Sequence, residues 1–138
     1  MVLNGRKRIL VLHHDRPLLR TYAMLLERYG YEVATVDSVM QMILKLEAPE
    51  GCFDLLFVEC SPELRQNSAN FVRFVQETQA HSHPALILNG VGAYDVLQAA
   101  KQEGVAAACK PQDVDEFMSL LAAMLNGQRR RFAQGKSA

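Results

Sequence analysis

Short apolar runs recur along the chain and alternate with longer stretches in which apolar residues are spaced apart. The runs at 9–12, 55–58 and 85–88 are continuous and strongly apolar, which is typical of strands covered on both faces. Two further runs, at 32–36 and 105–109, are less apolar or built from small residues. The pattern predicts five strands, of which the first, third and fourth are the most buried.

The stretches between these runs have the spacing of three and four residues that marks one face of a helix. Apolar residues from Leu18 to Tyr29 show it first, and Gly30 then ends the segment. Ser38 and Gln41 have the form of a capping box that opens a second helix. In all we predict five helices, at 18–29, 38–47, around 71–78, at 93–102 and at 113–126.

Strands and helices therefore alternate throughout, with connections short enough for right-handed crossovers. This alternation predicts a doubly wound α/β domain, a parallel sheet with helices on both faces. At 138 residues the chain has room for one such domain, which we place at 1–127. Gly127 is expected to end the last helix, and the basic segment 128–138 is expected to be a disordered tail.

Charge and composition narrow the classes of partner. Fifteen basic and fifteen acidic residues give zero formal net charge, so no overall field attracts nucleic acid or an anionic membrane, and we expect neither as a partner. No apolar run is long enough to span a bilayer, and the first residues lack a secretory pattern. Cys52, Cys60 and Cys109 are an odd number without metal-binding spacing, so we expect reduced thiols and a cytoplasmic location.

Candidate functional residues lie where the predicted strands end, because ligands of open parallel sheets bind outside the carboxyl ends of the strands. Polar residues follow four of the five strands at this edge. They are His13, His14 and Asp15, then Glu59, then Asn89 with Gly90, and finally Lys110 with Pro111.

The order of these segments resembles the response-regulator receiver domain of two-component signalling, over roughly residues 8–126. The resemblance implies a flavodoxin-like fold with strand order 2-1-3-4-5. It rests on the run 9–12 with its polar triplet, the segments LLERYGYEV at 25–33, DLLFVE at 54–59 and PALIL at 84–88, and Gly104 followed by Lys110-Pro111.

The resemblance also implies a role for each position. Family members accept a phosphoryl group on an aspartate that ends the third strand, and an acidic pair after the first strand helps to hold Mg²⁺. They contact the phosphoryl group through a hydroxyl after the fourth strand and through a lysine that precedes a proline. Here the matching positions are Glu59 for the acceptor, His13 and His14 (or His14 and Asp15 in a shifted register) for the acidic pair, Asn89 for the hydroxyl, Gly90 for the small residue after it, Ala107 for the switch aromatic, and Lys110 with Pro111 retained.

These departures remove much of the phosphotransfer chemistry. Mg²⁺ prefers oxygen ligands in octahedral geometry, so imidazoles in place of carboxylates predict that Mg²⁺ binding is lost, and we expect no metal and no cofactor. The side chain of Glu59 is one methylene longer than that of an aspartate, so its carboxylate is displaced. A displacement of about 1 Å can lower the rate of a catalysed step by about a hundredfold. The sequence thus predicts a degenerate receiver that is not an enzyme and acts as a phosphorylation-independent interaction module.

Several interpretations of these residues stay open at this point. Glu59 and Lys110 form either a structural ion pair or a switch in which the carboxylate holds the lysine in an active-like contact. His13 and His14 are expected to be ordinary loop residues, since adjacent residues leaving a strand point to opposite faces. The alternative is a transition-metal site that uses one histidine with Asp15 and Glu59.

The expected partner is a signalling protein, either a histidine kinase or a downstream effector. The resemblance places this contact, or a homodimer contact, on the face made by the helices at 93–102 and 113–126. Two other functions compete with this interpretation. One is a receiver that is still phosphorylated in an unusual way, and the other is a flavodoxin-like binder of a metal or nucleotide, although no glycine-rich loop follows the first strand.

Overall fold

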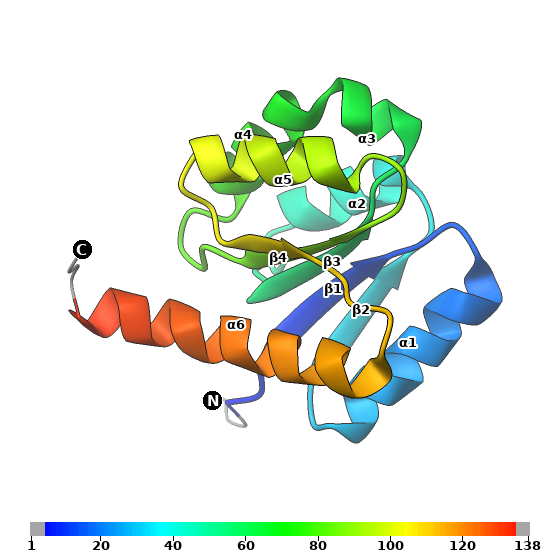
Figure 1. Ribbon diagram of the computed structural model, residues 1–138, viewed down its shortest axis with the longest axis vertical. Helices are drawn as coiled ribbons and strands as arrows, with labels where there is room; N and C mark the ends of the chain where they lie inside the picture. Colours follow the sequence, from blue (N-terminus) through cyan, green and yellow to red (C-terminus); the bar gives the residue numbers. More distant parts are fainter. Residues whose placement is uncertain (1–4, 135–138) are drawn as a thin grey trace.

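A computed structural model describes residues 5–134 and contains one five-stranded parallel sheet (Figure 1). The strand order is β2-β1-β3-β4-β5, which confirms the predicted order. Every neighbouring pair of strands runs parallel. The strands are β1 (Arg8–Leu12), β2 (Glu32–Val36), β3 (Leu55–Glu59), β4 (Ala85–Asn89) and β5 (Ala107–Cys109).

Helices cover both faces of this sheet. Figure 1 shows α1 and α6 on one face and α2, α3, α4 and α5 on the other. Within the described residues no helix is long and apolar enough to cross a membrane. The helices are α1 (Arg16–Arg28), α2 (Val39–Glu47), α3 (Pro62–Gln66), α4 (Ser68–Thr78), α5 (Ala93–Gln102) and α6 (Val114–Gln134).

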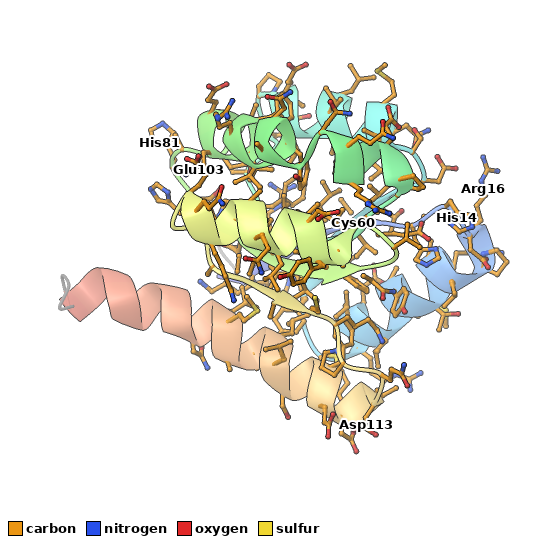
Figure 2. The ribbon with its side chains drawn as sticks, turned by 45° about the horizontal axis from the view of Figure 1, so that its top comes forward. His14, Arg16, Cys60, His81, Glu103 and Asp113 are labelled. Carbon is orange, nitrogen blue, oxygen red and sulfur yellow. The ribbon has the colours of Figure 1, made fainter. Side chains whose placement is uncertain are left out.

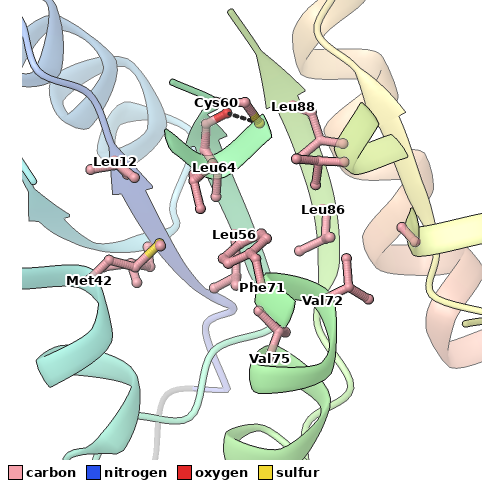
Figure 3. Close-up of a cluster of buried hydrophobic side chains, with 14 of the residues drawn as sticks. Leu12, Met42, Leu56, Cys60, Leu64, Phe71, Val72, Val75, Leu86 and Leu88 are labelled. Atoms are coloured by element: carbon pink, nitrogen blue, oxygen red, sulfur yellow. Dashed lines mark hydrogen bonds between the residues drawn. The ribbon is translucent and has the colours of Figure 1, made fainter. Parts of the chain in front are cut away.

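Alternate residues of the strands supply two separate cores, because successive side chains leave a strand on opposite sides. Leu10, Leu56 and Leu86 pack with α2 to α5 (Figure 3), whereas Ile9 and Ile87 pack with α1 and α6. All five side chains are at most 1% exposed. Burial on both faces explains why these strands are continuously apolar in sequence.

Two segments differ from the sequence-based prediction. The loop that contains Pro62 forms the short helix α3, where the Ser61 side chain accepts a hydrogen bond from the Leu64 N–H. The last helix does not end at Gly127 but continues to Gln134, so its backbone crosses the predicted boundary between domain and tail. A single helical glycine costs only about 1 kcal/mol, and flanking helix-forming residues offset that cost. The predicted tail residues 135–138 lie outside the described residues.

Candidate functional site

The candidate site lies where β1 and β3 end side by side. These strands are paired in register, with Leu12 opposite Val58, so the residues that follow Leu12 lie next to Glu59 at the end of β3. β4 continues the same edge, because Glu59 is opposite Asn89. Figure 2 shows His14 and Cys60 on this edge of the molecule.

Glu59 accepts hydrogen bonds from His14 and lies close to the ring of His13. The backbone N–H of His14 donates to Glu59 Oε1 at 2.9 Å. Nδ1 of His14 lies 2.8 Å from both carboxylate oxygens, and Nε2 of His13 lies 3.7 Å from Oε2. The Glu59 side chain is 22% exposed, so these donors replace much of the water that a free carboxylate would bind.

Both histidines reach Glu59 because the strand ends before them. β1 stops at Leu12, and the alternation of side chains between the two faces of the sheet stops with it. The rings of His13 and His14 are stacked, with centroids 5.2 Å apart and planes 15° from parallel. The expectation that the two histidines point to opposite faces is therefore wrong.

The contacts shift the proton affinities of the Glu59–His14 pair in opposite directions. Partial burial raises the pKa of Glu59, but the hydrogen bonds from His14 and the charges of both histidines outweigh it, so the net pKa lies below its usual value. The hydrogen bond to Glu59, followed by its charge, raises the pKa of His14. The site thus favours a carboxylate beside an imidazolium.

Asp15 has a different role from the one predicted for it. Its Oδ1 accepts a hydrogen bond from the Leu18 N–H at 3.2 Å, which caps the N-terminus of α1. Its backbone N–H donates to Nδ1 of His13 at 3.0 Å. The carboxylate of Asp15 is therefore engaged by the helix, and the group of potential metal ligands here is His13, His14 and Glu59, not one histidine with Asp15 and Glu59.

Lys110 does not contact Glu59. Its Nζ donates to the carbonyl of Pro111 at 2.8 Å and lies 5.3 Å from the centre of the Phe117 ring. Among the side chains that the structure describes, the ion pairs of Glu59 are those with His13 and His14. The predicted Glu59–Lys110 pair is therefore wrong, both as a structural ion pair and as an active-like contact, and the two histidines are the partners of the carboxylate instead.

Asn89 at the end of β4 and Gly90 after it frame the site through their backbone. The carbonyl of Asn89 accepts a hydrogen bond from the Cys60 N–H at 2.6 Å. Gly90 has φ +94°, and a Cβ at this position would meet the Cys60 carbonyl oxygen at 2.9 Å. Ala107 of β5 pairs with Leu86 of β4 and packs against the buried cluster. Its methyl side chain supplies no aromatic ring at the switch position.

Two aromatic residues that the sequence analysis did not single out lie near the site. The Tyr22 ring lies 6.0 Å from the His13 ring and edge-on to Phe57, and Phe117 lies beneath Lys110. Tyr22 lies three residues after Leu19 and one turn before Leu26, the two buried residues of α1. That helical position is the signal that could have placed it beside the end of β1.

Comparison with known proteins supports the fold. No protein-family profile matches the sequence, and no curated protein matches it. A receiver domain protein (CheY-like) from Methanospirillum hungatei is similar at TM-score 0.72 and 18% identity, covering 92% of this chain and 99% of that one. A receiver domain protein from Clostridium thermocellum gives 0.67 and 23%, covering 89% and 97%. An adenylate cyclase from Rhodopirellula baltica gives 0.69 and 16%, covering 95% and 99%. The chain has the fold of response-regulator receiver domains.

Proposed function

We propose that this chain is a degenerate receiver that acts in signal transduction as a phosphorylation-independent protein-interaction module. The observation that carries the proposal is that the carboxylate of Glu59 already accepts hydrogen bonds from His14. The residue at the phosphoacceptor position is bound through its carboxylate by the backbone and the imidazole of His14. A carboxylate whose two oxygens are held in this way has no free oxygen directed at a phosphoryl donor.

The surroundings of Glu59 support the same proposal. Phosphoryl transfer depends almost entirely on positioning and on cations that neutralise the developing charge. Mg²⁺ requires oxygen ligands, whereas His13 and His14 present imidazole nitrogens beside Glu59. Lys110 is directed toward Pro111 and Phe117. Among the described residues, Glu59 therefore lacks an ion pair with Lys110, and its histidine neighbours are poor ligands for Mg²⁺.

A signal would then pass through the surface of the domain. We place the partner contact on α5, β5 and the start of α6, where Val91, Tyr94 and Val114 are 69%, 66% and 54% exposed. Large apolar side chains at this exposure are the anchors that protein interfaces use. The partner we propose is a histidine kinase, a downstream effector or a second copy of this chain.

Incubation with acetyl phosphate and Mg²⁺, followed by intact-mass spectrometry, tests the proposal. We expect an unchanged mass, while a phosphorylatable receiver in the same reaction gains one phosphoryl group. Millimolar Mg²⁺ is expected to leave the melting temperature unchanged, because an ion that does not bind the native state cannot stabilise it. A phosphoryl adduct that Glu59→Ala abolishes would overturn the proposal.

A further inference from the structure

Three potential metal ligands converge at the carboxyl edge of the sheet from two neighbouring strand ends. His13 and His14 follow β1, and Glu59 ends β3. One donor atom from each residue lies within 4.8 Å of the other two. The Glu59 side chain is 22% exposed and that of His14 is 77% exposed, so the cluster is supported by the protein on one side and open to water on the other.

The spacing of the donors suits a small dication. Metal–nitrogen and metal–oxygen bonds of about 2.0–2.2 Å place the ligands of a tetrahedral ion about 3.3 Å apart. The distance from His13 Nε2 to Glu59 Oε2 is 3.7 Å, and that from His14 Nδ1 to Glu59 Oε1 is 2.8 Å. These two values lie on either side of the required separation, and the two histidine nitrogens lie within 4.8 Å of each other, so side-chain rotations can bring all three donors to it.

The chemistry of the donors selects the ion. Two imidazole nitrogens with one carboxylate oxygen form a set that Zn²⁺ and similar transition metals bind, with water in the open position. Mg²⁺ is disfavoured because it requires oxygen ligands. Cys60 adds no thiolate: its Sγ faces the Val58 carbonyl, and burial raises its pKa to about 12 (Figure 3). We propose that His13, His14 and Glu59 form a binding site for a Zn²⁺-class transition metal.

Binding requires a change at both histidines: Nδ1 of His14 releases to water the proton that it donates to Glu59, and the ring of His13 changes tautomer. Nδ1 of His13 accepts the Asp15 N–H, so the proton of the neutral ring is on Nε2, the nitrogen nearest Glu59. Coordination through Nε2 moves that proton to Nδ1 and ends the hydrogen bond from Asp15. The loss of this hydrogen bond from Asp15 weakens the metal affinity by about tenfold and is expected to change the environment of the Asp15 amide.

Titration of the metal-free protein with Co²⁺, followed by its visible absorption and by competition with Zn²⁺, tests the site. We expect saturable binding of one ion, weakened at least tenfold by His14→Ala and by Glu59→Gln. His81→Ala is the matched control, because His81 is exposed on the opposite side of the molecule in Figure 2 and its loss should leave the affinity unchanged. Unchanged Co²⁺ affinity in both site variants would overturn the proposal, as would an equal loss in His81→Ala.

A second measurement examines His13 without removing its buried ring. In ¹H–¹⁵N spectra, Zn²⁺ is expected to shift the Asp15 amide of the full chain, and Glu59→Gln is expected to abolish that shift at the same Zn²⁺ concentration. An Asp15 amide unaffected by saturating Zn²⁺ would exclude coordination by His13 Nε2 and overturn the three-ligand site. The proposed function is tested separately, since phosphorylation by acetyl phosphate would contradict it whether or not Co²⁺ binds.

Discussion

Replacing Gly90 by alanine is predicted to destabilise the loop that follows β4. Gly90 has φ +94°, a backbone conformation that costs an L-residue about 1–2 kcal/mol. The new Cβ would also lie 2.9 Å from the Cys60 oxygen and 3.2 Å from the Cys60 nitrogen. Cys60 cannot move away easily, because its N–H donates to Asn89 and its carbonyl accepts from the Gly92 N–H.

The expected loss for Gly90→Ala is about 2–5 kcal/mol, the sum of this backbone strain and of overpacking at about 1–3 kcal/mol. Gly104→Ala is the matched control: its φ is +76° and no atom lies within 4 Å of its added Cβ, so only the strain applies. Urea unfolding followed by circular dichroism gives both values. Losses that agree within about 0.5 kcal/mol would refute the argument that contact with Cys60 requires this glycine.

Three further predictions concern buried polar contacts and charge. The Gln79 side chain is buried at 1% exposure; it accepts the Phe53 N–H at 2.9 Å and donates to the carbonyls of Gly51, Leu46 and Thr78 at 2.7, 3.2 and 3.3 Å. Gln79→Ala should lower the free energy of unfolding in urea by about 2–5 kcal/mol, whereas Gln76→Ala, at an exposed position, should lower it by less than about 1 kcal/mol. The difference in stability between the unmodified protein and Glu59→Gln should be largest from pH 4.5 to 6.5. The stabilisation from ionised Glu59 is present above pH 4.5 and is lost as pH falls through the lowered pKa of Glu59, whereas that from protonated His14 is present below pH 6.5 and is lost as pH rises through the raised pKa of His14. A difference that does not vary with pH would contradict this. Lys110→Met should cost at most about 1 kcal/mol in urea unfolding and leave the NMR-measured pKa of His14 unchanged, and a shift there would show that Lys110 acts on Glu59.

The fold could be predicted from the sequence because its signals are local and consistent. The run 85–88 is apolar at every position since both faces of β4 are covered. Ser38 caps α2 through the Gln41 N–H, as the spacing of these two residues indicated. α6 was predicted less well, because the stop expected at Gly127 requires a left-handed conformation that the sequence alone does not reveal.

The candidate site was predicted by residue but not by contact. Periodicity and resemblance identified Glu59, His13 and His14, yet they assigned Lys110 as the partner of Glu59. The alternation rule describes side chains only as far as a strand extends, and β1 ends at Leu12. The direction of the next two side chains depends on backbone angles that no sequence pattern specifies. In the structure both histidines are directed to Glu59, while Lys110 is directed to Pro111 and Phe117.

The side chain of Glu59 is long enough for its carboxylate to reach Nδ1 of His14, and a last prediction tests whether this length is required. Aspartate is shorter by one methylene, about 1.5 Å, so Glu59→Asp should lengthen the contacts of 2.8 Å with His14 Nδ1 beyond hydrogen-bonding distance. Because the hydrogen bond is the largest cause of the raised pKa of His14, that pKa should fall toward 6.5 while the negative charge is kept. NMR titration of the His14 ring in metal-free buffer measures it, with Glu59→Gln as the variant of equal length and no charge. If His14 titrates identically in Glu59→Asp and in the unmodified protein, charge and not reach determines the pairing, and an aspartate would serve equally well beside these histidines.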